Sequence, residues 1–154
     1  MFESDPFIVR ESKSSVNESS NKIIVLYFGN PLVEEDSMAL EVGRRLKRDI
    51  QLQNRYRFIE CLKPEDFFDE ITSNQIIILD VAENSTDILE INDPDLLSIN
   101  SIYSAHQQNL SFYLKLFKAM GDITNIRILT IPTHGNIDQL ASKVSTLLQN
   151  PKKN

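Results

Sequence analysis

Asp36, Asp80 and His106 are residues whose types could together bind one divalent metal ion. Asp36 ends a group of three acidic residues that follows an apolar run and a turn. Asp80 lies at the end of a second apolar run, where burying a carboxylate is costly unless it is paired or binds a cation. His106 lies in a loop just before a helical pattern. Two carboxylates and an imidazole suit zinc, iron or nickel.

Each of these residues also has an ordinary structural explanation. The acidic group that Asp36 ends could simply favour the start of a helix through the helix dipole. Asp80 could be a turn or cap residue, and His106 could be a solvated or hydrogen-bonded histidine. His134 also follows a strand and could approach the same place, but we interpret it mainly as a loop residue.

Short apolar runs alternate with helical patterns, which predicts an α/β fold: a three-layer sandwich with a mostly parallel sheet of about five strands and helices on both faces. The expected strands are 22–28, 56–61, 75–82, 87–91 and 125–131. The expected helices are 37–51, 64–71, 109–120 and 137–148. Because ligands of such sheets bind outside the carboxyl ends of the strands, we expect Asp36 and Asp80 at one edge of the sheet, with His106 near it.

Two further features of these elements can be predicted. Strand 56–61 alternates more in polarity than the other strands, so it is expected nearer an edge of the sheet. In helix 37–51 one apolar stripe should face the core, formed by Met38, Ala39, Val42, Leu46 and Ile50.

The chain of 154 residues is long enough for one domain with a substantial core, which we assign to residues 22–150. Residues 1–21 are rich in serine, asparagine and glutamate and are expected to be a flexible tail. Residues 1–15 lack the apolar core of a secretory signal, so none is expected, and no apolar run reaches the roughly 20 residues that span a bilayer. A single cysteine, Cys61, fits a reducing cytoplasm, and the net charge of −6 argues against nucleic acid or an anionic membrane as partner.

Other chemistries have less support from the sequence. It contains no glycine-rich dinucleotide motif, no phosphate-binding loop and no nucleophile elbow around a serine. Cys61 lies within a strand pattern and is most simply a small core residue.

The segments around these candidate residues resemble the hydrogenase maturation endopeptidases. Residues 29–36 are similar to that family's Gly-Asn-x-Leu-x-x-Asp-Asp/Glu signature, which follows an apolar strand. Residues 76–82 resemble its apolar strand ending in Asp-Ala, and residues 104–110 its Ser-x-His-x-x-Gly-Leu segment. The resemblance extends in order from about residue 22 to residue 148.

The resemblance implies a peptidase-like domain that removes the carboxyl-terminal extension of a nickel–iron hydrogenase large-subunit precursor after nickel insertion. It implies an aspartic-type, nickel-dependent endopeptidase of the cytoplasm, a monomer without a permanent metal, which recognises nickel carried by the substrate. Asp36, Asp80 and His106 would be the catalytic and nickel-recognising residues. The positions that could support them are Gly29, Asn30 and Glu35.

The nickel could hold the scissile bond in place or polarise its carbonyl, with Asp36 or Asp80 as a base for water. The family's usual glycines are replaced here by Tyr27, Ser37 and Asn109, and Val81 separates Asp80 from the alanine. Bulkier residues around the first loop could narrow the cleft. Two alternatives therefore stay open: a non-catalytic relative that binds a metal-bearing partner as a maturation or assembly factor, and a plain scaffold whose acidic residues only cap helices.

Overall fold

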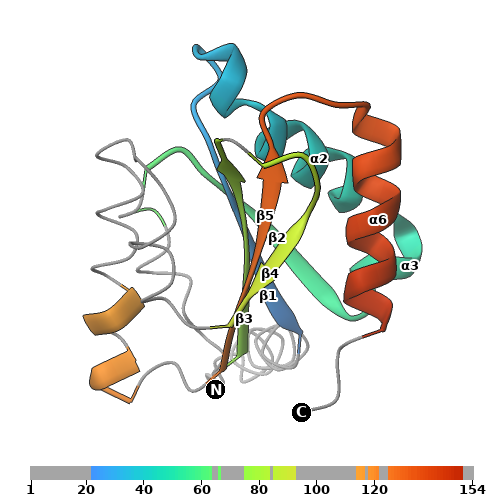
Figure 1. Cartoon of the computed structure of the whole chain (residues 1–154). Helices are drawn as coiled ribbons and strands as arrows, with labels where there is room; N and C mark the ends of the chain where they lie inside the picture. The colour runs from blue at the N-terminus through green and yellow to red at the C-terminus, as the bar shows by residue number, and fades with distance from the viewer. Residues whose placement is uncertain are drawn as a thin grey trace, which may run out of the picture.

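A five-stranded sheet in the order β2-β1-β3-β5-β4 forms the centre of the protein (Figure 1). The computed structural model describes residues 22–63, 66, 75–83, 85–92, 114–116, 118–121 and 125–150. The strands are β1 (Ile23–Phe28), β2 (Tyr56–Cys61), β3 (Gln75–Ala82), β4 (Leu89–Ile91) and β5 (Asn125–Pro132). Only β4 is antiparallel to its neighbour among the described strands, so the sheet is mostly parallel, as predicted.

Each face of the sheet carries its own hydrophobic cluster. Side chains of β1, β3 and β5 pack on one face against α2 (Met38–Lys47), α3 (Ile50–Gln53) and α6 (Ile137–Gln149). The alternate side chains of the same strands pack on the opposite face, where Leu114, from a helical turn at 114–116, is fully buried with them. We call these the helix-pair cluster and the Leu114 cluster. Burial on both faces explains why the central strands are nearly continuous apolar runs.

The strand boundaries agree closely with the sequence pattern. Strands β2 and β3 have the predicted bounds, and β2 pairs only with β1 among the described strands, which confirms its predicted edge position. The predicted strand 87–91 is shorter, because the Asp87 carboxylate accepts hydrogen bonds from the Ile88 amide and the Lys143 ammonium.

The prediction of one helix over 37–51 was wrong. Helix α2 ends at Lys47, and α3 starts at Ile50 with Asp49 as its N-cap, because the Asp49 side chain accepts a hydrogen bond from the Gln51 amide at 2.9 Å. The break changes the phase of the helical stripe. Ile50 is consequently 76% exposed, whereas Leu52 is buried in the helix-pair cluster.

Some predicted elements lie wholly or partly outside the described residues. This is true of the tail 1–21, of most of helix 64–71 and of the first part of helix 109–120. The end of helix 109–120 agrees with the prediction, because Gly121 has φ of 84°, the left-handed geometry typical of a helix carboxyl cap. No helix within the described ranges has the length and apolar character needed to cross a membrane.

Gly43 of α2 packs directly against the ring of Tyr27 on β1. A Cβ atom added at Gly43 would lie 2.3 Å from Cγ of Tyr27, so only glycine lets the helix pack over this ring. Tyr27 is 1% exposed, and burial, together with the Glu60 carboxylate, raises the pKa of its phenol to about 12, against the opposing effect of Arg44. Because Tyr27 belongs to the helix-pair cluster, its ring fills the core beneath α2.

Candidate functional site

Asp80 and Thr130 are the buried polar residues of the described part of the chain, and they are neighbours. They are 1% and 4% exposed, and they are register partners on the parallel strands β3 and β5. Side chains alternate between the faces of a strand, and Ile76 and Ile78 belong to the Leu114 cluster, so the Asp80 side chain lies on that face. Asp80 and Thr130 therefore form a polar position on an otherwise apolar face, close to the carboxyl ends of β3 and β5.

Local hydrogen bonds hold this polar position in place. The Asp80 Oδ1 atom accepts a hydrogen bond from the Val81 amide at 3.0 Å. The Thr130 hydroxyl donates to the Leu89 carbonyl at 3.3 Å, which ties the start of β4 to β5. Asp80 lies two residues before the end of β3, because the strand continues through Val81 and Ala82. The carboxylate is thus fixed within a strand of the scaffold, whereas the sequence pattern suggests the strand end.

Asp36 comes to the same edge of the sheet from the loop after β1. It ends the short 3-10 helix η1 (Glu34–Asp36) and is half-buried. Its carbonyl accepts a hydrogen bond from the Asn30 amide at 3.3 Å, which closes the loop back onto the end of β1. β1 and β3 are parallel neighbours in which Tyr27 pairs with Leu79. Asp36 therefore lies in the loop that follows the carboxyl end of β1, and Asp80 lies near the carboxyl end of the adjacent strand β3.

Gly29 is required where this loop returns to the sheet. A Cβ atom added at Gly29 would lie 2.3 Å from the Asp36 carbonyl oxygen and 2.9 Å from Cγ of Leu40. No real Cβ contact is that short, so a larger residue must displace the segment that carries Asp36. Two of the predicted supporting residues, Gly29 and Asn30, thus contribute to the conformation of this loop. The third, Glu35, is exposed within η1.

We expect Gly29→Ala to lower the free energy of unfolding by about 1–3 kcal/mol, because the added methyl group overpacks the contact with the Asp36 carbonyl. Urea denaturation measures this loss. Pro31→Ala, at an exposed position of the same loop, is the control and should cost less than about 1 kcal/mol. A Gly29→Ala protein as stable as the wild type would mean that the loop moves to accommodate the added methyl group without any loss in the free energy of unfolding.

Of the two candidate histidines, the described structure places His134, which follows the carboxyl end of β5 at this same edge of the sheet. His106 lies outside the described residues, so its predicted place beside Asp36 and Asp80 stays a prediction. His134 is exposed in the loop between β5 and α6. Within the described ranges, no group of three or more histidine, cysteine or acidic side chains is arranged to hold a metal ion. Cys61 is fully buried in the Leu114 cluster, as expected of a core residue.

Thr130 was not identified from the sequence. The signal for it is a hydroxyl residue within an otherwise apolar strand end, the same signal that singled out Asp80 on β3. Whether this hydroxyl residue lies beside Asp80 depends on the register of β3 and β5, which a sequence pattern does not give.

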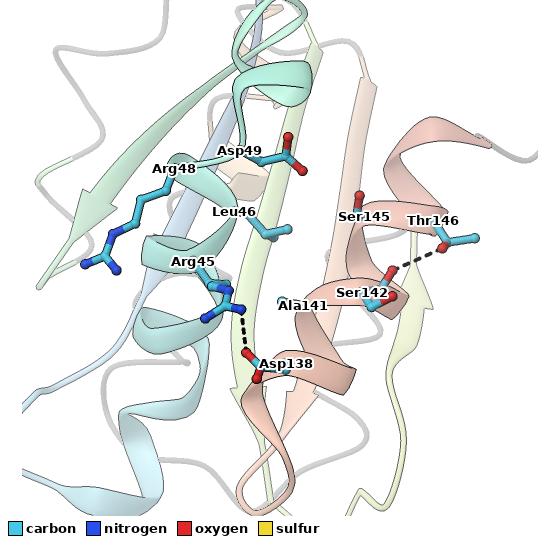
Figure 2. A pocket seen from close by; sticks show the side chains of 9 residues that line it. All are labelled: Arg45, Leu46, Arg48, Asp49, Asp138, Ala141, Ser142, Ser145 and Thr146. Atoms are coloured by element: carbon cyan, nitrogen blue, oxygen red, sulfur yellow. Dashed lines mark hydrogen bonds and ion pairs between the residues drawn. The ribbon is translucent and has the colours of Figure 1, made fainter.

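A surface pocket of about 490 Å³ lies elsewhere, between α2 and α6 (Figure 2). In Figure 2 Arg45 points across the pocket to Asp138, and the two side chains form an ion pair at 2.9 Å. Both are more than half exposed, and such pairs interact weakly in water. The helices that form the pocket cover the face of the sheet opposite the Asp80 side chain. The pocket therefore offers no support for catalysis by the predicted residues.

Comparison with known proteins gives matches among solved structures. HybD, a hydrogenase maturating endopeptidase from Escherichia coli, aligns with a TM-score of 0.60 and 17% identity over 83% of this chain and 93% of that chain. The [NiFe] hydrogenase maturation protease HycI from Thermococcus kodakarensis KOD1 aligns with a TM-score of 0.61 and 17% identity, over 88% of this chain and 99% of that chain. A hydrogenase 3 maturation protease aligns with a TM-score of 0.61 and 18% identity, over 84% of this chain and 90% of that chain. No family model and no curated protein sequence matches the chain.

These alignments cover most of both chains, and they establish the class of fold. The chain has the α/β fold of the hydrogenase maturation endopeptidases, with its mostly parallel five-stranded sheet. The fold that the sequence resemblance implied is therefore confirmed.

Proposed function

We propose that this protein is an endopeptidase that removes the carboxyl-terminal extension of a nickel–iron hydrogenase large-subunit precursor after nickel has been inserted. The fold shared with hydrogenase maturation proteases supports the proposal. The observation that carries it is the pair of carboxylates, Asp36 and Asp80, at the carboxyl edge of adjacent strands. Ligands of α/β sheets bind at this edge.

In this proposal the metal belongs to the substrate. Nickel held by the precursor is recognised by Asp36, Asp80 and His106, and no permanent metal is needed. The carboxylate of Asp80 is suited to this role because it is buried in an apolar cluster, where its attraction to a cation is screened less than in water. Recognition of the metal holds the nearby peptide bond against the same edge of the sheet.

The chemical step needs a water molecule, a base and stabilisation of the developing oxyanion. The substrate's nickel can polarise the scissile carbonyl. Asp36, half-buried in a loop, or Asp80, buried in a strand, can accept the proton of the attacking water. The aspartic-type assignment rests on these two carboxylates.

The alternative of a non-catalytic relative is motivated in part by the bulky residue at position 27. The Tyr27 ring packs in the helix-pair cluster beneath Gly43, on the face of the sheet opposite the Asp80 side chain. Its bulk therefore does not narrow the space beside Asp80. Binding of the precursor without cleavage would still favour this alternative.

The test is incubation of the purified protein with a hydrogenase large-subunit precursor, loaded or not loaded with nickel, followed by mass spectrometry. We expect one carboxyl-terminal fragment to be released from the loaded precursor only. His106→Ala should abolish the release, and its melting temperature is measured to check that the variant is folded. An intact loaded precursor that remains bound to the wild type would indicate an assembly factor, and a precursor that neither binds nor is cut would contradict both functions.

A further inference from the structure

The loop after β1 presents large apolar side chains to solvent. Leu32 is 92% exposed and Val33 is 46% exposed. Single exposed apolar residues are common on protein surfaces. Here, however, Leu62 directly follows β2, and Leu89 starts β4 opposite Thr130; both are more than half exposed. Exposed apolar side chains are thus distributed along the carboxyl edge of the sheet, the edge that carries Asp36 and Asp80.

The tip of this loop has a fixed conformation. The Asn30 side chain accepts a hydrogen bond from the Leu32 amide at 3.0 Å, and the Asn30 carbonyl accepts one from the Val33 amide at 3.1 Å. The Val33 carbonyl in turn accepts one from the Asp36 amide at 3.0 Å. Leu32 and Val33 are therefore held outward by an ordered turn. A surface that is already ordered loses little conformational entropy when a partner binds.

The charge beside the tip indicates the chemistry of its partner. Glu34 and Glu35 directly follow Val33 and are exposed, and residues 29–37 contain no lysine or arginine. An apolar pair flanked by two carboxylates is complementary to a polypeptide segment in which an apolar side chain lies next to a basic one. Nucleic acid and anionic lipid would be repelled by the same charges.

We propose that the Leu32–Val33 tip is the docking surface for the hydrogenase precursor, and that it binds a precursor segment with an apolar side chain next to a lysine or arginine. This inference rests on the proposed function. The tip and Asp36 belong to one hydrogen-bonded loop, in which Val33 binds the Asp36 amide. Docking at the tip therefore fixes the position of the precursor relative to Asp36, and substrate selection takes place on the loop that carries a candidate catalytic group.

The experiment compares KM for cleavage, and Kd for binding, of the nickel-loaded precursor with wild type and with a Leu32→Ser/Val33→Ser double variant. Both positions are exposed, so the variant should fold, and its melting temperature checks this. We expect KM and Kd to rise about tenfold, as for loss of a central apolar contact. Ile50→Ser is the matched control, because Ile50 is 76% exposed on α3, beside the opposite end of β2, and should change neither value more than twofold.

A second variant tests the charge complementarity. Glu34→Lys/Glu35→Lys should slow association with the precursor at low salt, and the difference should shrink as salt screens the charges. If the Leu32→Ser/Val33→Ser variant has wild-type KM and Kd, the docking surface is disproved while the proposed function stands. A wild-type protein that neither binds nor cuts the loaded precursor overturns both. If the wild type binds without cutting, the Kd values alone decide on the docking surface.

Discussion

Asp80→Asn is expected to lower kcat/KM for precursor cleavage by about 100-fold to 10,000-fold, the range typical of a lost acid–base or charged group. Asparagine is almost isosteric with aspartate and can still accept the hydrogen bond from the Val81 amide. It carries no charge, however, so it would neither attract the nickel of the substrate nor accept a proton. The measurement is steady-state cleavage of the nickel-loaded precursor.

Stability separates a functional carboxylate from a structural one at this position. Burying a charge is costly, so Asp80→Asn should leave the free energy of unfolding unchanged within about 1 kcal/mol, or raise it. Asp138→Asn, at an exposed position on α6, is the control and should keep full activity. A strongly destabilised Asp80→Asn protein whose folded fraction still cuts at the wild-type rate would show that the carboxylate only supports the fold.

Gly43→Ala is expected to lower the free energy of unfolding by about 2–3 kcal/mol. The added methyl group would lie 2.3 Å from Cγ and 2.8 Å from Cβ of Tyr27, and a ring buried at 1% exposure has no free space into which it can move. Helix α2 would have to shift away from β1. Urea denaturation gives the free energy, and the near-ultraviolet circular dichroism of the tyrosines reports the change in packing.

The sign of this effect makes the test decisive. Alanine has a higher helix propensity than glycine by about 1 kcal/mol, so propensity alone predicts that Gly43→Ala stabilises the protein. The contact with Tyr27 predicts the opposite. An equally stable or more stable variant would therefore show that α2 does not pack on this ring as described. Ser142→Ala, on the exposed face of α6, controls for the effect of alanine in a helix and should change stability by less than about 0.5 kcal/mol.

The sheet was predictable because strands that are buried on both faces are nearly continuous apolar runs in the sequence. Strands β2 and β3 were placed to the residue, and the weaker apolar character of β2 gave its edge position. The direction of β4 was not predictable, because a strand of three residues looks the same in parallel and antiparallel pairs. The break before Ile50 was missed because the local hydrogen bond of Asp49 overrides a helical period that continues through it.

The candidate site was predictable only as far as topology determines it. Parallel strands bring their carboxyl ends to one edge, so the order of strands and helices along the chain is enough to assign Asp36 and Asp80 to the same edge. Thr130 could not be assigned as the polar neighbour of Asp80 in this way, because the pairing of these two residues depends on the register between β3 and β5. The sequence also does not reveal why residue 29 has to be glycine. The reason is the close approach of the Asp36 carbonyl where the loop comes back to the sheet, and not the turn at the start of the loop.

The position of β5 has a consequence for synthesis of the protein. It is the last of the described strands along the chain, yet it lies between β3 and β4. A nascent chain that ends before residue 125 lacks both β5 and α6, so the edge of β3 is not yet covered by β5 and the apolar side chains of α2 lack their partners on α6. An uncovered strand edge and exposed apolar surface favour aggregation. The domain should therefore depend on a ribosome-associated chaperone, or on rapid translation of residues 125–149, until about residue 149 has emerged from the exit tunnel.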